Sequence, residues 1–414
     1  MAPDAASLDA DAAHYLRPGT LQLPTLPPLS LYVHVPWCLR KCPYCDFNSH
    51  ERAGGVAAIP EAEYVEALRA DLESALPLIW GRHVVSVFIG GGTPSVLSAR
   101  AIDRLLSDVR ALLPLEPDCE VTLEANPGTF EAAKFASFRA AGITRLSIGI
   151  QSFDDAMLKS LGRVHDGAQA RAAIEIAQRS FENFNLDLMY ALPAQTLEQM
   201  RQDVEAALRI EPPHLSLYQL TLEPNTAFAK YPPPLPDEDA AAEMHEWIEE
   251  RTQRAGYSHY EVSAYARPGR TCRHNLNYWS FGDYLGIGAG AASKLSFPHR
   301  IVRQTRFKQP ESYLRGAARR AFIAEAHEVA RADLPFEFML NALRLSAGFP
   351  IRWFMERTGL PLSALEPALQ NAERRGLVVR DLESIRPTPL GRRFLSDLQS
   401  LFLPRRTVAE LGPI

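Results

Sequence analysis

From residue 30, short apolar segments alternate with longer segments whose apolar residues repeat at helical spacing. Residues 30–36 alternate apolar and polar side chains, a pattern typical of a strand. Residues 98–112 carry an apolar side chain at every third or fourth position, which predicts an amphipathic helix with Ser98 as its N-cap. The strands expected are 30–36, 84–90, 120–125, 145–151, 184–190 and 215–221, and the helices are 60–76, 98–112, 129–141, 196–208 and 237–255, with a further helix capped by Asp166.

The strand and helix units repeat at roughly 30 to 40 residues, which is the size of a βαβ crossover. Because such crossovers build parallel sheets, the pattern predicts an α/β fold with a parallel sheet or a partial or complete parallel (β/α) barrel. A seventh strand is expected over 258–265, and the regular alternation ends after residue 266.

The pattern changes again near residue 326, where helices precede two short strands and a final helix. Two helices followed by a two-stranded wing are typical of a winged helix-turn-helix. The expected domains are a disordered N-terminal tail over 1–29, the barrel over 30–325, a winged-helix-like domain over 326–404 and a tail over 405–414.

Polar residues or glycines stand at the carboxyl ends of the first five expected strands. In parallel barrels these ends gather on one face, where binding sites are built. Each polar residue could also be there only because polar residues favour loops, so the series carries more weight than any single position. The series comprises Cys38 with Cys42 and Cys45, Gly90–Gly92, Glu124, Gln151 and Asp187, with Gln219 as a candidate sixth member.

The composition is that of a globular chain, with 46% hydrophobic and 22% charged residues. No apolar run approaches the roughly 20 residues needed to span a bilayer, so membrane contact is expected to be peripheral at most. Residues 1–30 lack the pattern of an export signal, which favours a cytoplasmic protein with reduced thiols. A net charge of −5 argues against a nucleic-acid partner, and we expect none in spite of the winged-helix pattern.

The segment "CLRKCPYC" places Cys38, Cys42 and Cys45 within eight positions, and the two other cysteines stand alone. A structural zinc site needs four ligands, so zinc would require His34 or His50 in addition. A [4Fe–4S] cluster also usually takes four thiolates, and with only three thiolates one iron stays open to a small chelating molecule. A second motif, "GGGTPS" at 90–95, lies between a strand and a helix, where backbone N–H groups can approach an anion.

The CxxxCxxC spacing together with the GGTP-like turn resembles the radical S-adenosylmethionine (SAM) superfamily. The resemblance implies a [4Fe–4S] cluster held by Cys38, Cys42 and Cys45, with the methionine part of SAM as the exchangeable fourth ligand. For Arg163 and Asp187 the alternative is a structural ion pair at the barrel mouth. The positions that the resemblance assigns to one or two SAM sites are Tyr32, Tyr44, Gly91, Gly92, Thr93, Glu124, Gln151, Arg163 and Asp187.

Further motifs, among them "LYVHVPWC", "LEANPGT", "FNLDLMYALP" and "HNLNYW", resemble the subfamily of oxygen-independent coproporphyrinogen III dehydrogenase and the heme chaperone HemW. The dehydrogenase has a further cysteine in a CxC arrangement where this chain has Asp46 and Phe47, and its N-terminal arm is longer. The resemblance therefore favours the heme chaperone branch. The alternative is oxidative decarboxylation of coproporphyrinogen III by SAM radical chemistry, so whether the protein is an enzyme stays open.

In the chaperone reading, His274 of "HNLNYW" is a candidate axial ligand of heme iron, and Tyr278 and Trp279 could pack on the macrocycle. The alternative is that His274 caps a turn and Trp279 belongs to the core. Many relatives have histidine where this chain has Ala292, so His259, His165 and Tyr284 are candidate substitutes. The partners that this reading implies are heme, acceptor hemoproteins such as respiratory enzymes, and a flavodoxin-type reductant.

Overall fold

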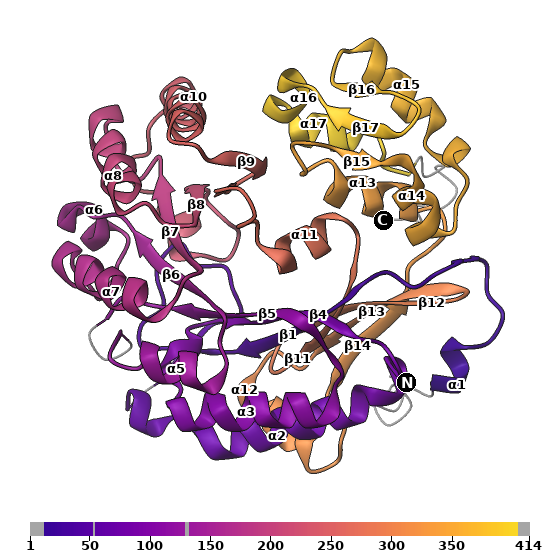
Figure 1. Cartoon of the computed structure of the whole chain (residues 1–414), viewed down its shortest axis with the longest axis horizontal. Helices are drawn as coiled ribbons and strands as arrows, with labels where there is room; N and C mark the ends of the chain where they lie inside the picture. The colour runs from indigo at the N-terminus through magenta and orange to yellow at the C-terminus, as the bar shows by residue number, and fades with distance from the viewer. Residues whose placement is uncertain (1–11, 53, 129–131, 405–414) are drawn as a thin grey trace.

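The computed structural model describes residues 12–52, 54–128 and 132–404, and most of the strands belong to one twelve-stranded sheet (Figure 1). Seven neighbouring strands at its centre run parallel. In sheet order they are β11 (Asp283–Ile287), β1 (Leu29–Val35), β4 (Val84–Gly91), β5 (Leu115–Ala125), β6 (Arg145–Gln151), β7 (Phe184–Tyr190) and β8 (His214–Gln219).

Antiparallel strands extend the sheet on both sides and leave it open. Beyond β8 lie β10 (Ala264–Ala266) and β9 (Ser258–Glu261). Beyond β11 lie β12 (Ala292–Phe297), β13 (Arg300–Arg306) and β14 (Ile323–Glu328). Because the edge strands β9 and β14 do not pair in the described part of the chain, the sheet forms a partial barrel. A partial barrel is one of the forms that the sequence predicted.

The six strands predicted over 30–221 are confirmed, and the segment predicted as a seventh strand consists of two short strands instead of one. Residues 258–266 form the antiparallel hairpin of β9 and β10, and the seventh parallel strand is β11. β11 pairs with β1, which is more than 240 positions earlier in the chain. No local pattern marks such a distant pairing, so the alternation of strands and helices missed it.

Helices cover the outer face of the sheet, and the two predicted caps, Ser98 and Asp166, are confirmed. The Ser98 hydroxyl accepts a hydrogen bond from the N–H of Ala101 at 3.1 Å, and Asp166 and Thr196 each form a capping box. The helix expected over 129–141 is described only as α5 (Phe135–Ala141), and residues 129–131 lie outside the described residues. The other covering helices are α2 (Glu61–Ala75), α3 (Ala99–Leu112), α7 (Gly167–Ser180), α8 (Leu197–Ile210) and α10 (Glu238–Arg254).

The inner face of the partial barrel is polar, and one short helix lies across it. α11 (Arg273–Trp279) runs between the inner face of the sheet and the C-terminal domain (Figure 1). Its Asn277 amide donates to the Ser30 hydroxyl at 2.9 Å, and the His274 ring stacks on Phe88 at 4.1 Å. α11 thus forms a floor beneath the carboxyl ends of the strands.

The C-terminal residues form a separate hydrophobic core with the element order of a winged helix. We propose that this domain begins after Glu328, because β14 crosses the expected boundary at 325 and pairs with β13 in the large sheet. The sequence pattern missed the short strand β15, which completes a three-stranded sheet with the two wing strands. The elements are α13 (Leu334–Ala342), β15 (Phe349–Pro350), α14 (Ile351–Thr358), α15 (Glu366–Arg374), β16 (Val378–Arg380), β17 (Ser384–Pro387), α16 (Pro389–Arg393) and α17 (Leu395–Ser400).

The expectation of a disordered tail over 1–29 is wrong for the described residues 12–29. Leu21 and Leu23 are buried in the C-terminal core, and the Tyr15 ring stacks on Phe297 at 5.0 Å. The apolar residues of a Pro-rich segment are buried here against a distant domain, which no local pattern indicates. Residues 1–11 and the expected tail 405–414 lie outside the described residues. Among the described helices, none is long and apolar enough to cross a membrane.

Candidate functional site

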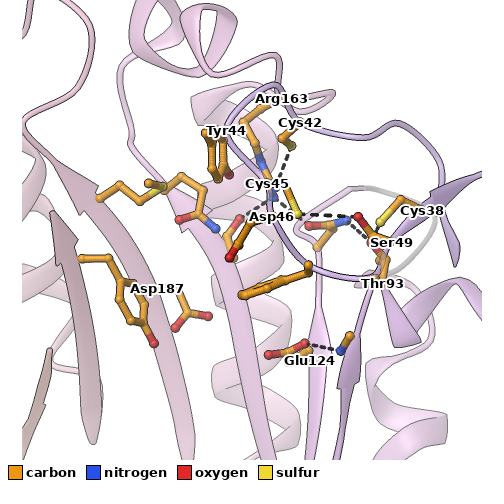
Figure 2. Close-up of a pocket in the computed structure, with 18 of the residues that line it drawn as sticks. Cys38, Cys42, Tyr44, Cys45, Asp46, Ser49, Thr93, Glu124, Arg163 and Asp187 are labelled. Carbon is orange, nitrogen blue, oxygen red and sulfur yellow. Dashed lines mark hydrogen bonds between the residues drawn. The ribbon is translucent and has the colours of Figure 1, made fainter. Parts of the chain in front are cut away.

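The three clustered cysteines lie on a loop that follows β1, and the two ends of this loop lie side by side. Cys38 is in β2 (Trp37–Cys38), which pairs with β3 (His50–Glu51) in parallel, so the ends of the loop are held together. The N–H of Cys45 donates to the carbonyl of Cys42 at 3.1 Å, and the Lys41 ammonium donates to two loop carbonyls. These bonds bring all three thiols to one side of the loop, where they line a single cavity (Figure 2).

Each of the three thiols has a polar neighbour from outside its own turn (Figure 2). Thr93 donates to Cys38 Sγ at 3.4 Å, Ser49 Oγ lies 3.5 Å from Cys45 Sγ, and Arg163 donates to Cys42 Sγ at 3.7 Å. Burial raises the pKa of the Cys38 thiol to about 11, so without a metal this thiol keeps its proton at neutral pH. Metal coordination would replace that proton, and the neighbouring donors would stabilise the resulting thiolates.

The glycine run lets the end of β4 lie directly against the cysteine loop. A Cβ on Gly91 would lie 2.6 Å from the His34 ring, and one on Gly92 would lie 2.7 Å from the Trp37 carbonyl oxygen. Gly91 has a φ of 117°, which disfavours any other residue. The N–H groups are not free for an anion as the sequence suggested, because those of Gly91, Gly92 and Thr93 donate to Glu124, Val35 and Trp37.

Two carboxyl groups, those of Glu124 and Asp187, line the cavity. Glu124 ends β5 and accepts the Gly91 N–H at 3.1 Å, while Asp187 on β7 accepts from Ser147 at 3.0 Å and Asn185 at 2.7 Å. Burial, followed by the charge of Asp187, raises the pKa of Glu124 to about 8. Burial also raises the pKa of Asp187. Two such carboxyl groups are suited to bind a cation or several hydroxyl groups.

Arg163 joins the cysteine loop to the strand ends. It donates to the Asn126 side chain at 2.7 Å and to the Gly149 carbonyl at 2.8 Å, in addition to Cys42. Its partners do not include Asp187, so the described contacts do not support the alternative of a structural ion pair between these two residues. Gln151 closes this side with a φ of 67°, a left-handed backbone at the last residue of β6.

Most of the candidate residues line one cavity of about 450 Å³. The sequence pattern missed several lining residues that stand one to four positions from those it found. Ser147 and Tyr218 follow the two-residue period of β6 and β8, so strand alternation was the signal that could have found them. The predicted residues in the lining are Cys38, Cys42, Tyr44, Cys45, Gly91, Gly92, Thr93, Glu124, Gln151, Arg163, Asp187 and Gln219, and the missed residues include Ser49, Asn126, Ser147, Met189 and Tyr218.

Two predicted residues lie outside the cavity lining. Tyr32 donates or accepts a hydrogen bond at 2.7 Å with His34 Nδ1, and its ring stacks on Phe88. The His274 ring stacks on the same residue, Phe88, and His274 is only 6% exposed. Its ring nitrogen Nδ1 lies 3.0 Å from Cys272 Sγ. His274 therefore occupies the barrel interior beneath the cavity.

The candidate substitutes for the histidine replaced by Ala292 already have partners. His259 is bonded to Glu249 at 2.7 Å, His165 to the Ile150 carbonyl at 3.1 Å, and the Tyr284 hydroxyl accepts from Arg303 at 2.9 Å. Ala292 itself is exposed at the start of β12.

The residues fit an iron–sulfur cluster better than zinc. His34 is engaged by Tyr32 and by the Asn48 carbonyl, and His50 bonds to the Asn48 side chain. Within the described residues, neither histidine forms a metal-ligand group with the three cysteines. The loop therefore offers three thiols with no fourth protein ligand, which is the donor set of a cluster with one open iron.

Comparison with known proteins identifies the family. The model of the Radical SAM superfamily matches residues 32–207, and that of the HemN C-terminal domain matches residues 329–394. The heme chaperone HemW of Haemophilus influenzae is 47% identical over 92% of this chain and 99% of its own length. The chain belongs to the HemW family. The HemW of Escherichia coli is also 47% identical, over 91% of this chain and 99% of its own length.

A solved structure shows the same fold as this HemW-family chain. It is coproporphyrinogen III oxidase (HemN) from Escherichia coli, with a TM-score of 0.77 and 23% identity over 91% of this chain and 90% of that one. At this identity the likeness establishes the radical SAM fold with its C-terminal domain and no more. Membership of the superfamily implies a [4Fe–4S] cluster and SAM, in agreement with the three thiols and the cavity described above.

Proposed function

We propose that the protein is a heme chaperone that binds heme, a [4Fe–4S] cluster and SAM, and delivers heme to acceptor hemoproteins such as respiratory enzymes. The observation that carries this proposal is the 47% identity to two proteins named heme chaperone HemW, over almost their entire length. The cavity supports the cofactor part of the proposal, because three thiols and two carboxyl groups face it together.

In this proposal Cys38, Cys42 and Cys45 hold three irons of the cluster, and SAM completes the fourth. The methionine amine and the ribose hydroxyls would meet Glu124 and Asp187, since a carboxylate accepts hydrogen bonds from both kinds of donor. The remaining proposed contacts with SAM come from the rim of the same cavity, namely Tyr44, Gly91, Gly92, Thr93, Gln151 and Arg163. Tyr32 would not contact SAM directly. It would position its neighbours, through its ring contact with Phe88 and its hydrogen bond to His34.

His274 remains the proposed ligand of heme iron, and its surroundings define what heme binding requires. The ring is buried between Phe88 and Tyr278, with Cys272 and Glu120 at its nitrogens. Heme iron can reach these nitrogens only when α11 moves away from the floor of the barrel. Beside it, the Trp279 indole N–H is buried with no partner in the described structure, and Arg344 stacks on its ring at 4.1 Å.

A heme titration tests the function and the ligand separately. Protein reconstituted with its cluster under anaerobic conditions is titrated with heme, and the Soret absorbance is recorded. We expect one heme per chain for the wild type and for His83→Ala, a control at an exposed histidine far from the motif in sequence. His274→Ala should lose binding or shift the Soret maximum. Absence of stoichiometric binding in the wild type would contradict the chaperone function, whereas an unchanged His274→Ala spectrum would contradict only the ligand.

Heme delivery is tested with an acceptor. Heme-loaded protein is mixed with a heme-free respiratory hemoprotein, and transfer is followed as recovery of the acceptor's activity. We place this exchange in the cytoplasm, with a flavodoxin-type protein as the reductant of the cluster and at most peripheral membrane contact. Retention of all heme by the donor in the presence of a competent acceptor would limit the protein to heme binding.

The alternative enzyme activity, oxidative decarboxylation of coproporphyrinogen III, rests on a fold that is only 23% identical to the oxidase. Where the dehydrogenase continues its motif with a further cysteine, this chain has Phe47, which is 61% exposed at the cavity rim. We expect no protoporphyrinogen when coproporphyrinogen III, SAM and a strong reductant are incubated with the reconstituted protein. Formation of that product would assign the enzyme activity to this chain.

A further inference from the structure

Three buried side chains of metal-ligand type meet beneath the cavity. Glu120 comes from β5, and Cys272 and His274 come from the start of α11, so 152 positions separate the first two. Their exposed fractions are 8%, 1% and 6%, and their ligand atoms all lie within 4.8 Å of one another. Among the described residues this is the group of three that could hold a metal ion, and it is separate from the three cysteines of the cavity.

The distances between the three ligand atoms agree with a tetrahedral metal site. Glu120 Oε1 lies 3.6 Å from His274 Nδ1 and 3.6 Å from Cys272 Sγ, and Sγ lies 3.0 Å from Nδ1. Tetrahedral bonds of ordinary zinc length place nitrogen, oxygen and sulfur ligands about 3.4 to 3.6 Å apart. Two of the three distances already have this value, and the third needs to open by only about half an ångström.

The surrounding charges allow a divalent cation. A divalent ion with one carboxylate and one thiolate is neutral, which limits the free-energy cost of burial. Arg145 is buried nearby, close enough to influence the pKa values of Glu120 and Cys272, and its Nε has no hydrogen-bond partner in the described structure. Asp187 on the cavity side remains near Arg145 as its counter-charge.

We infer that Glu120, Cys272 and His274 form a second metal site, which binds a divalent transition ion such as Zn²⁺ with one further ligand from water. One oxygen, one sulfur and one nitrogen donor suit borderline ions of this class, whereas magnesium and calcium prefer oxygen ligands alone. This site goes beyond the heme chaperone function. An ion bound there would also hold α11 on the floor of the barrel and occupy the imidazole that heme iron would need.

The same contacts have a simpler explanation that the experiment must exclude. The N–H of Arg273 donates to Glu120 at 3.0 Å and the Cys272 thiol donates to it at 3.6 Å, so Glu120 could serve only to satisfy the start of α11. In that case the three side chains would bind no ion. Zinc captured by the cavity cysteines is a second outcome to separate, and it would show three sulfur ligands instead of one.

The test is zinc content combined with zinc-edge X-ray absorption on cluster-containing protein, purified anaerobically from cells grown with added zinc. Iron in the cluster does not contribute to the zinc edge. We expect one zinc per chain with one sulfur and three nitrogen or oxygen ligands. Cys272→Ser should lose the sulfur ligand and bind zinc more weakly by more than the about 10- to 100-fold typical of outer-shell changes. Cys119→Ser, at the residue before Glu120, should keep both the zinc and its sulfur ligand.

Three results would overturn the site: no stoichiometric zinc in the wild type, a zinc with two or more sulfur ligands, or a Cys272→Ser spectrum identical to that of the wild type. The wild-type spectrum alone decides the first two, so the test survives a variant that fails to fold. Circular dichroism and iron content show whether each variant keeps its fold and cluster. The heme titration is recorded on protein freed of zinc, so failure of the zinc site leaves the chaperone proposal standing, and failure of heme binding leaves the zinc site standing.

Discussion

The mouth and the floor of the partial barrel each contain a glutamate from the same strand, and the two behave in opposite ways. Glu124 and Glu120 are four positions apart on β5, and so lie on the same face of the sheet. Burial by itself raises the pKa of both. The pKa of Glu124 stays raised, at about 8, because its nearest charge is Asp187 and its one opposing contact is the Gly91 N–H. The pKa of Glu120 is lowered to about 2.

The pKa values of Glu120 and Glu124 differ because their interaction partners differ, and not because one is buried and the other is not. Burial raises the pKa of Glu120 as well, but the hydrogen bond from His274, the charge of Arg145 and the Arg273 N–H together outweigh it. The floor therefore holds the Glu120 carboxylate with several internal partners, whereas at the mouth Glu124 has only the Gly91 N–H. A site that lacks internal partners is prepared for a ligand that supplies them. The predictions below test this contrast, in order of decreasing effect.

The largest effect is expected at the cysteine loop of the mouth. Cys42→Ala removes one of only three thiols that face the cavity, so the [4Fe–4S] cluster should be lost almost completely. Iron and sulfide content and electron paramagnetic resonance of the reduced protein measure this loss. Cys119→Ala is the matched control and should keep the cluster, because this half-buried thiol is not part of the cavity lining. A full cluster in Cys42→Ala would refute the assignment of the three ligands.

The second effect concerns the stability of the floor. Glu120→Gln removes the carboxylate that accepts the Arg273 N–H and one of the two carboxylate charges near the buried Arg145, so it should lower the free energy of unfolding by about 1–3 kcal/mol. Glu124→Gln should change the free energy of unfolding by less than about 1 kcal/mol, because this side chain lacks a cationic partner. Urea denaturation of the cluster-free variants at pH 7 compares them. Equal costs at the two positions would remove the contrast between floor and mouth.

The third effect is on SAM binding and reverses the order of the two glutamates. Glu124→Gln removes a carboxyl group that would become a charged acceptor once the SAM amine lies beside it, and such a hydrogen bond is worth about 1.5–3 kcal/mol, or an affinity loss of about 10- to 100-fold. Glu120→Gln should leave the affinity within about threefold, since Glu120 does not line the cavity. Isothermal titration of the reconstituted proteins with SAM under anaerobic conditions gives both values. A larger loss of SAM affinity in Glu120→Gln than in Glu124→Gln would mean that SAM binds deeper in the barrel than the cavity described here.

The smallest effect is a pH dependence. The pKa of Glu124 is about 8 in the folded protein and 4.5 as an ordinary value, so the folded state binds more protons between these limits. The free energy of unfolding of the ligand-free wild type should therefore fall relative to Glu124→Gln as pH rises from about 6 to 8, by less than about 1.4 kcal/mol per pH unit. The free energy of unfolding of the wild type relative to Glu120→Gln should show no such slope in this range, because both proteins keep Glu124 and the pKa of Glu120 is about 2. Denaturation series at several pH values measure both slopes. A wild-type free energy of unfolding that rises with pH relative to Glu124→Gln would contradict the prediction.

Much of the architecture could be predicted from local sequence. The six strands between residues 30 and 221 and the caps Ser98, Asp166 and Thr196 follow from patterns that span a few residues. The gathering of strand-end residues around one cavity also follows, because parallel strands end on one face. β11 and the burial of Leu21 and Leu23 could not be predicted, since each depends on pairing or packing with residues far away in the chain.

The candidate site shows the same division. The spacing of Cys38, Cys42 and Cys45, together with the GGTP-like turn, resembled a superfamily that binds a cluster with an open iron, and that chemistry needs only three thiols on a short loop. The N–H groups of the glycine run looked available for an anion, but in the fold those of Gly91, Gly92 and Thr93 donate to Glu124 and to the backbone carbonyls of Val35 and Trp37. Which acceptors these N–H groups bind depends on residues that are far away in the sequence and adjacent only in the folded protein.

The sequence by itself determined the identities and spacings of the chemical groups, and with them the class of cofactor and the α/β plan of the chain. The tertiary structure alone decided which carboxylate receives partners and which is left to a ligand, and it placed His274 in the interior with Cys272 and Glu120. The physical reason is that burial and charge pairing depend on distances in space. A strand fixes only the face on which Glu120 and Glu124 lie, while helix α11, which begins 153 positions after Glu120 in the chain, supplies partners to one of them and not to the other.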